Sequence, residues 1–180
     1  SSDLLRIIGA MWQNADHFVL LTELTRDGSI MDLDTLDGHR YVLGARNSGA
    51  QWSGQHILGS LGIDFENKFT LAYMGYGPTV NAIQDGTIVG MNIPAGVPVS
   101  TITRALATGG DRLTLLSFTD EHLARVNASY PLWVRYVIPA GTYPNQTEDI
   151  RTIACPNVLA VRADIPEEVV YKITRTIFEN

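Results

Sequence analysis

The segment Gly44–Ala50 carries residue types that could bind a small anion. It reads Gly-Ala-Arg-Asn-Ser-Gly-Ala and joins an expected strand at 40–44 to an expected helix at 50–61. The first N–H groups of a helix lack partners within the helix and carry partial positive charge. The asparagine and serine add donors, and the arginine can form a fork onto a carboxylate. Expected contacts are Arg46, Asn47, Ser48, Gly49 and Ala50. The alternative interpretation is an ordinary helix cap followed by a turn glycine.

A second turn of the same kind follows the expected strand at 88–91. Its residues Gly96, Val97 and Pro98 precede an expected helix at 99–106. The carboxyl ends of parallel strands meet at one edge of an α/β sheet, and ligands bind there. We therefore expect both turns to contribute to one anion pocket, with two ordinary loop ends as the alternative.

Trp12 lies between two expected strands and is a candidate aromatic side chain of the binding cleft. Packing in the core is the alternative interpretation, since most large aromatic side chains are buried.

The sequence shows no pattern typical of an enzyme or a metal site. The four histidines have no metal-ligand spacing, and the single Cys155 lies in an apolar run, as a structural thiol does. There is no Gly-x-Ser-x-Gly nucleophile motif, dinucleotide fingerprint or phosphate-binding P-loop. We expect no catalytic residues, no metal and no cofactor.

The charge and hydropathy patterns exclude two classes of partner. The net charge is −6 and lysine and arginine do not cluster, which disfavours nucleic acid. No apolar stretch approaches the roughly 18 residues of a membrane span, so we expect no direct membrane insertion. The chain opens on Ser1-Ser2-Asp3 and enters an apolar segment at once. We expect a partial chain from which a signal peptide has been removed.

Hydrophobic periodicity predicts an α/β fold with a mostly parallel sheet flanked by helices, because strands and helices alternate through the middle of the chain. Two long extended runs flank this block, as in a chain that crosses between two lobes and returns. Expected strands span 4–8, 17–24, 40–44, 69–73, 88–91, 113–117, 133–138 and 150–161, the last broken at Pro156; expected helices span 50–61, 78–84, 99–106, 120–127 and 165–180.

Several segments resemble one family of transport receptors. Ile138–Pro144 (Ile-Pro-Ala-Gly-Thr-Tyr-Pro), Thr152–Pro166 and Leu36–Ala50 are similar to segments of the TAXI branch of solute-binding receptors. These receptors serve tripartite ATP-independent periplasmic (TRAP) transporters, and an older name is immunogenic 31-kDa-type protein. Ala50 and Val99 stand where the family usually has hydroxyl residues, which points to a ligand that is more apolar on one side.

The resemblance implies a type II periplasmic-binding-protein-like fold, with residues 35–150 as the second lobe. Residues 1–34 would supply hinge strands and part of the first lobe, and 151–180 the return crossover and a first-lobe helix. The implied function is capture of a small anionic solute, an amino acid or carboxylate such as glutamate, for membrane permease subunits of a TRAP-type transporter. The implied location is the periplasm, or the outer face of a Gram-positive membrane. A ligand-sensing module of a signalling protein is the alternative.

Overall fold

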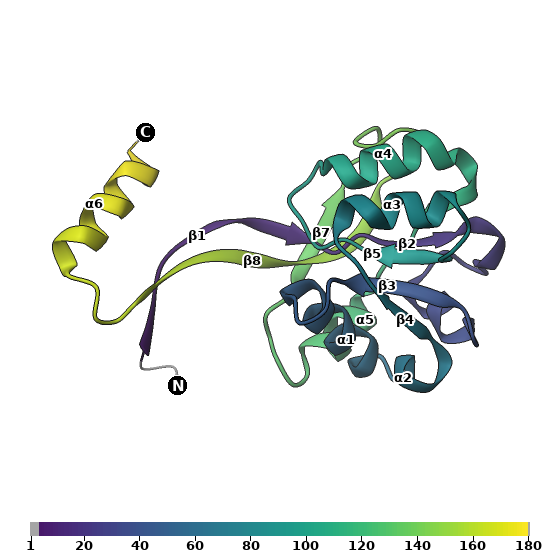
Figure 1. The fold of residues 1–180 in the computed structure, drawn as a ribbon, viewed down its shortest axis with the longest axis horizontal. Coiled ribbons are helices and arrows are strands. Elements are labelled where there is room, and N and C mark those ends of the chain that lie inside the picture. The colour runs from purple at the N-terminus through teal and green to yellow at the C-terminus, as the bar shows by residue number, and fades with distance from the viewer. Residues whose placement is uncertain (1–3, 180) are drawn as a thin grey trace. The chain divides into compact units, whose positions relative to one another are not determined.

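The computed structural model describes residues 4–179 and contains two compact units. Unit 1 comprises the described residues up to Gln13 together with those from Pro156 onward, and unit 2 spans Asn14–Cys155. Two long strands, β1 (Leu5–Ala15) and β8 (Ile150–Arg162), contribute residues to both units (Figure 1). Each unit is described by itself.

Unit 2 is built on a five-stranded sheet in the order β4-β3-β5-β2-β6. β3 pairs in parallel with β4 and β5, whereas β2 is antiparallel to both β5 and β6. Four of the five strands therefore run in the same direction, which confirms the mostly parallel sheet expected from the sequence. The strands are β2 (Phe18–Leu21), β3 (Arg40–Gly44), β4 (Thr70–Tyr73), β5 (Gly90–Asn92) and β6 (Leu113–Leu115).

Helices cover both faces of this sheet (Figure 1). Alternate residues of a strand point to opposite faces. Phe18 and Leu20 pack with Ile57 of α1 and Val126 of α5, whereas Val19 packs with side chains of α3 and α4. The helices of unit 2 are α1 (Gly49–Ser60), α2 (Phe65–Lys68), α3 (Tyr76–Gln84), α4 (Ser100–Gly109) and α5 (Asp120–Asn127), with 3-10 turns η2 (Thr22–Leu24), η3 (Ile30–Thr35) and η4 (Gly110–Arg112).

A second sheet has the order β1-β8-β7, with β7 at Val134–Ile138. β7 and β8 pair antiparallel from Val134↔Ala154 to Ile138↔Ile150. The sequence led us to expect a break at Pro156, but β8 continues through it. The ladder with β7 has already ended at Ala154, so the missing N–H of the proline costs no hydrogen bond there.

The compact units do not test the lobe boundary at 34/35 expected from the resemblance, which stays a prediction. Residues 14–34 belong to unit 2. The reason is that β2 pairs with both β5 and β6, and Ile30 and Leu33 of η3 are completely buried in the core beneath it. Strand β1 also extends through residues 13–15, where the sequence predicted a loop.

Unit 1 consists of the outer parts of β1 and β8 and the helix α6 (Glu167–Phe178). Glu167 and Glu168 lie in the first turn of α6, where they complement the helix dipole. None of the described residues of α6 is buried. No helix among residues 4–179 has both the length and the apolar character needed to cross a membrane.

Candidate solute-binding edge

The turn between β3 and α1 presents unpaired donors at the carboxyl end of β3. Ser48 is the N-cap of α1, and its hydroxyl oxygen accepts a hydrogen bond from the Gln51 N–H at 3.2 Å. The helix-cap interpretation is therefore confirmed, although the Ser48 hydroxyl can still donate its own proton. The N–H groups of Gly49 and Ala50 have no acceptor among residues 4–179. Backbone donors at a helix start of this kind can bind an anion.

Asn47 and Arg46 shape the outer side of this turn. Asn47 adopts a left-handed conformation with φ of 61°, and its N–H donates to the Gln51 side-chain oxygen at 2.7 Å. The guanidinium carbon of Arg46 lies 4.1 Å from the ring centre of Tyr73, at the end of β4. No carboxylate among residues 4–179 forms an ion pair with Arg46. Within these residues its positive charge is therefore in contact with the Tyr73 ring and is not paired with a carboxylate.

Three helices begin at this edge, which we call the carboxyl edge because β3, β4 and β5 all end there. α1, α3 and α4 each follow one of these strands. The connecting loops also touch: the Tyr76 hydroxyl at the start of α3 donates to the Pro94 carbonyl at 2.8 Å, and Arg46 lies over Tyr73. The sequence predicted that the turns after β3 and β5 lie at the same edge of the sheet, and in unit 2 they do. The structure adds the turn after β4, which leads into α3, to this edge.

The turn formed by Gly96, Val97 and Pro98 leads into α4, with a cis peptide bond before the proline. Val99 is the N-cap and lacks a side-chain cap. Its N–H instead donates to the Tyr143 hydroxyl oxygen at 3.2 Å. This N–H at the start of α4 is therefore already used within the protein.

His17 and Tyr143 form a buried chain of hydrogen bonds behind this turn. His17 Nδ1 lies 2.8 Å from the Ile93 carbonyl oxygen, which can only accept, so Nδ1 carries the proton. Nε2 then accepts from the Tyr143 hydroxyl at 2.8 Å. Burial lowers the pKa of His17 to about 4 and raises that of Tyr143 to about 12. These hydrogen bonds fix the position of Val99, the N-cap of α4, through side chains that carry no charge.

Asp16 and its neighbour His17 lie between β1 and β2, and their side chains have partners in different core clusters, Trp133 for Asp16 and Tyr143 for His17. The Asp16 carboxyl accepts hydrogen bonds from Asn92 Nδ2 at 3.0 Å and from the Trp133 indole N–H at 3.2 Å. Burial raises the pKa of Asp16 to about 7, and the two hydrogen bonds only partly offset that effect. Asn92 Oδ1 is buried without a hydrogen-bond partner among the described residues.

The sequence reasoning missed both buried networks. Asp16 and His17 end a mostly polar run that begins at Gln13, which is the composition of an ordinary loop, so the local sequence contains no signal that they are buried. Their partners, Asn92, Trp133 and Tyr143, lie far along the chain.

Trp12 lies in β1 within unit 1, and not in a loop between strands. It is also not packed in the core, because 54% of its surface is exposed. The remaining site residues named from the sequence all belong to unit 2, so the role of Trp12 in a cleft stays a prediction.

Metal-binding groups do not gather in the part of the chain that the structure describes. No set of three or more histidine, cysteine, aspartate and glutamate side chains there could hold a metal ion. Cys155 is half-buried, and burial raises the pKa of its thiol.

The family of the chain follows from its whole length. The model of the NMT1-like family matches residues 1–180. This chain belongs to the NMT1-like family. Curated proteins gave no match to it.

Solved structures show which fold this NMT1-like chain has. It is similar to a putative L-cystine ABC transporter protein from Listeria monocytogenes (13% identity, TM-score 0.50), covering 98% of this chain and 57% of that one. It is also similar to a putative periplasmic sulfonate-binding protein from Methylobacillus flagellatus (14%, TM-score 0.51; 97% and 42%). A third is a periplasmic binding protein from Brucella ovis with glutathione bound (10%, TM-score 0.51; 97% and 41%).

These likenesses confirm the fold expected from the sequence, a lobe of the type II periplasmic-binding-protein fold. The NMT1-like chain spans about half the length of the solved structures it matches, or less.

Proposed function

We propose that the protein is an extracytoplasmic solute-binding receptor, not an enzyme, that captures a small anionic solute for a transporter. The solute would be an amino acid or carboxylate, with glutamate-like compounds as the first candidates. Receptors of this fold hold a ligand between two lobes and close by a hinge movement. The carboxyl edge of unit 2 would supply one side of that cleft.

The observation that carries this proposal is the set of unused donors at the start of α1. The N–H groups of Gly49 and Ala50 and the guanidinium of Arg46, which has no carboxylate partner among residues 4–179, lie within five residues of one another. A carboxylate placed there would receive charge-assisted hydrogen bonds and the favourable end of the helix dipole. Ala50 offers no hydroxyl, so the backbone and the arginine would supply most of the binding energy.

A thermal-shift titration of the intact protein tests the proposal. The panel would contain amino acids, dicarboxylates, keto acids and sulfonates. A solute at about 100 times its dissociation constant stabilises the folded state by about 2.7 kcal/mol. We expect a shift with at least one anionic solute, which should be recovered chemically unchanged after incubation. The absence of a shift with every anion would contradict a receptor for this class.

Substitutions at Arg46 and Ser48 locate the site. Arg46→Ala removes a charge-assisted hydrogen bond, so we expect the dissociation constant to rise about tenfold to a hundredfold. Ser48→Ala removes a donor and the helix cap, and should raise it about tenfold while lowering stability by about 1 kcal/mol. Arg112→Ala, at the end of η4, is the matched control. Calorimetric titration measures all three; unchanged binding by Arg46→Ala and Ser48→Ala would remove this turn from the site.

We propose further that the receptor belongs to the TAXI branch and acts in the periplasm or on the outer face of the membrane. The support is the sequence resemblance of 138–144 and 152–166. The solved structures from Listeria and Methylobacillus are described as components of ABC transporters. An experiment must therefore distinguish a TRAP-type permease from an ABC permease as the partner. Uptake of the bound solute should continue when ATP is depleted if the partner is TRAP-type, and should stop if it is an ABC permease.

A further inference from the structure

A stack of three rings runs from the core of unit 2 to its surface. Trp133 and His56 are nearly parallel, with ring centres 5.0 Å apart and planes inclined by 6°. His56 and Trp52 continue the stack at 5.6 Å and 12°. Tyr130 meets the edges of both, at 6.2 Å from Trp52 and 5.9 Å from His56. The outermost ring, that of Trp52, has one face on His56.

The inner end of this stack is held in place by hydrogen bonds. The Trp133 indole N–H donates to Asp16, and its main-chain N–H donates to Asn127 Oδ1 at 3.0 Å. The Asn127 amide in turn donates to the Trp133 carbonyl at 2.8 Å. His56 Nε2 lies 3.3 Å from the Val126 carbonyl oxygen. Rings fixed in this way lose little conformational entropy when another ring packs on them.

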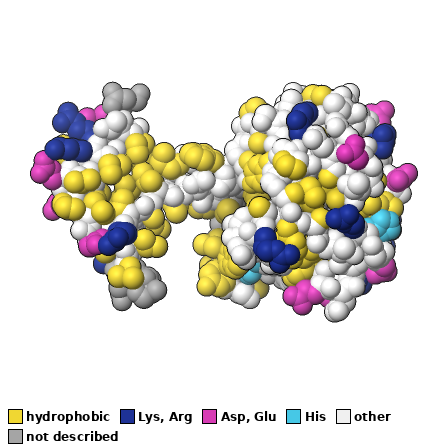
Figure 2. All heavy atoms as spheres, viewed as in Figure 1, with side chains coloured by type: hydrophobic (Ala, Val, Ile, Leu, Met, Phe, Trp, Pro, Cys, Tyr) yellow, Lys and Arg dark blue, Asp and Glu magenta, His cyan; other side chains and the backbone are white. Residues whose placement is uncertain are grey.

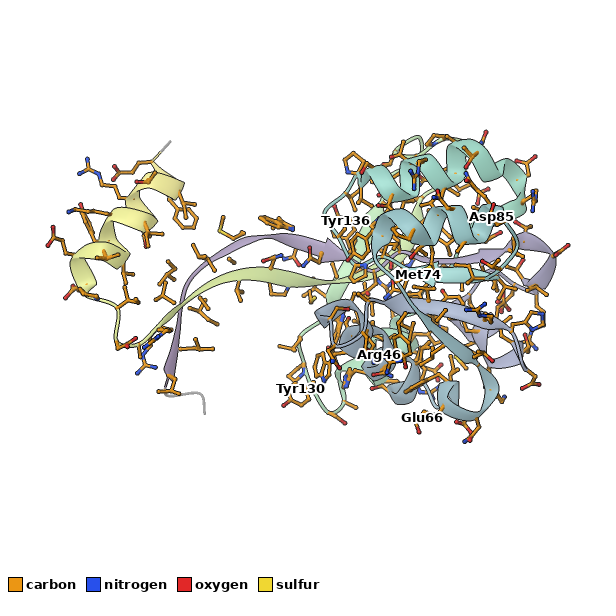
Figure 3. The ribbon with its side chains drawn as sticks, viewed as in Figure 1. Arg46, Glu66, Met74, Asp85, Tyr130 and Tyr136 are labelled. Atoms are coloured by element: carbon orange, nitrogen blue, oxygen red, sulfur yellow. The ribbon has the colours of Figure 1, made fainter. Side chains whose placement is uncertain are left out.

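Contacts with α1 place the stack at the carboxyl edge. Arg125 donates to the carbonyl of Leu61, just after α1, Val126 lies opposite His56, and Tyr130 touches Trp52. The chain from Arg125 to Tyr130 therefore runs beside α1 toward its first turn. Trp52 follows Ser48 by four residues, and residues at this spacing lie on the same face of a helix, so Trp52 belongs to the face of α1 on which the Ser48 cap lies. Figure 3 labels Arg46 and Tyr130, and both lie near α1.

The outer part of the stack is unusually exposed for its residue types. Trp52 is 52% exposed, Tyr130 54% and Leu132 45%. Figure 2 shows hydrophobic side chains gathered over the part of unit 2 where Figure 3 labels Tyr130. An apolar patch of this kind on the surface of a domain is typical of a binding surface.

We infer that Trp52 and Tyr130 are the specificity-determining part of the solute site and select an anionic solute with a flat aromatic body. The inference rests on the proposed function, because the anionic group would bind the N–H groups of Gly49 and Ala50 and the Arg46 guanidinium. The same molecule would then place its ring on Trp52 and extend the stack by one ring. A planar occupant fits because the surface offered is a ring face walled on one side by Tyr130.

Matched solutes separate this inference from the proposed function. Indole-3-acetate and phenylacetate carry one carboxylate and a ring, whereas hexanoate and glutarate carry carboxylates without a ring. Calorimetric titration of the intact protein should give at least about tenfold tighter binding of the aromatic acids, since stacking of one ring favours binding by about one to two orders of magnitude. Equal affinities would overturn the inference and leave the proposed function standing. No binding of any of the four would overturn this inference, and the larger panel would then test the function.

Three variants assign the preference to Trp52. Trp52→Ala should lose it, with aromatic acids bound at least about tenfold more weakly and hexanoate within about twofold of the unmodified protein. Trp52→Phe should keep most of the preference while reducing the tryptophan fluorescence change on binding, because Trp12 and Trp133 remain. Arg112→Ala should change nothing. Circular dichroism checks that each variant is folded.

The other outcomes contradict the inference. If Trp52→Ala weakens aromatic and aliphatic acids equally, Trp52 only supports the helix turn. If it weakens neither, Trp52 lies outside the site. If sedimentation shows that Trp52→Ala dissociates a dimer and ligand affinities are unchanged, the patch is an interface with a second copy of the chain.

Discussion

Asp16 and His17 are neighbours in sequence that burial affects in opposite ways. Burial raises the pKa of Asp16 from 3.8 to about 7 and lowers the pKa of His17 from 6.5 to about 4. In both cases the cause is the low polarity around the side chain, which disfavours the charged form. Between about pH 4 and pH 7 both side chains are uncharged in the folded protein. This is compatible with their hydrogen bonds to Asn92 and Tyr143.

The two shifts act on stability with opposite signs. The folded-state pKa of Asp16 lies above its unfolded value, so its contribution is complete below about pH 4 and is lost as the pH rises through 7. The folded-state pKa of His17 lies below its unfolded value. Its contribution is complete above about pH 6.5 and is lost as the pH falls through 4. From pH 4 to 6.5 the stability lost through Asp16 as the pH rises equals the stability gained through His17, so the sum of the two contributions does not change with pH.

Single substitutions should reveal each contribution. We expect Asp16→Asn to lose stability relative to the unmodified protein on acidification from pH 6.5 to 4, by about 1.4 kcal/mol per pH unit, the slope for one proton. His17→Gln should instead lose stability relative to the same reference as the pH rises from 4 to 6.5. Urea unfolding across this range measures both. Subtracting the values of the unmodified protein removes the pH dependence that the other carboxylates contribute. If the free energy of unfolding of a variant changed with pH in parallel with that of the unmodified protein, Asp16 and His17 would not be a buried, uncharged pair.

At the scale of elements, the β3–α1 turn depends on Gly44. Its φ is 140°, and a Cβ there would lie 2.8 Å from Ala50 Cβ, 2.9 Å from the Gln51 nitrogen and 3.0 Å from Ser48 Oγ. An alanine would therefore meet both a strained backbone conformation and the first turn of α1. The same atoms position the Ser48 cap and the donors that we assign to the solute.

Gly44→Ala should lower the free energy of unfolding by about 2 kcal/mol or more. The matched control is Gly49→Ala, because Gly49 has an ordinary φ and no atom lies within 4 Å of an added Cβ. We expect that control to be neutral or slightly stabilising, since alanine reduces the entropy of the unfolded chain. Chemical unfolding measures both. Equal stability of the two variants would show that α1 can shift to accommodate the Cβ.

Elements with strong local patterns could be predicted from the sequence. The strand at 40–44 and the helix at 120–127 have the predicted bounds, because apolar periodicity and capping residues both mark them. The helix α2 was missed because it is a single turn of four residues, Phe65–Lys68, capped by Asp64. One turn is too short to show periodicity.

The candidate site was predictable only where it is local. The turn after β3 reads as a binding loop because its donors are consecutive in sequence. The stack of Trp52, His56 and Trp133 could not be predicted, because the third ring joins the other two through pairing of distant segments. The hydrogen bond between His17 and Tyr143 spans 126 residues and depends on the same long-range packing.

At the scale of the whole molecule, the two units differ in how much they bury. Unit 2 contains both core clusters, whereas no described residue of unit 1 is buried. The apolar side chains of α6, including Val169, Tyr171 and Phe178, are exposed. Most helical stability in proteins comes from packing of an apolar face, and α6 has little of it within unit 1.

Amide hydrogen exchange of the 180-residue chain should therefore separate the units. We expect the amides of α6 and of residues 5–13 to exchange at least about a hundredfold faster than those of β2, β3 and β5, because exposed elements open locally at little cost. Protection of α6 equal to that of β3 would show that another surface covers it in solution. Repeating the exchange at two protein concentrations identifies that surface: protection that rises with concentration comes from a second copy, and protection independent of concentration comes from within the chain.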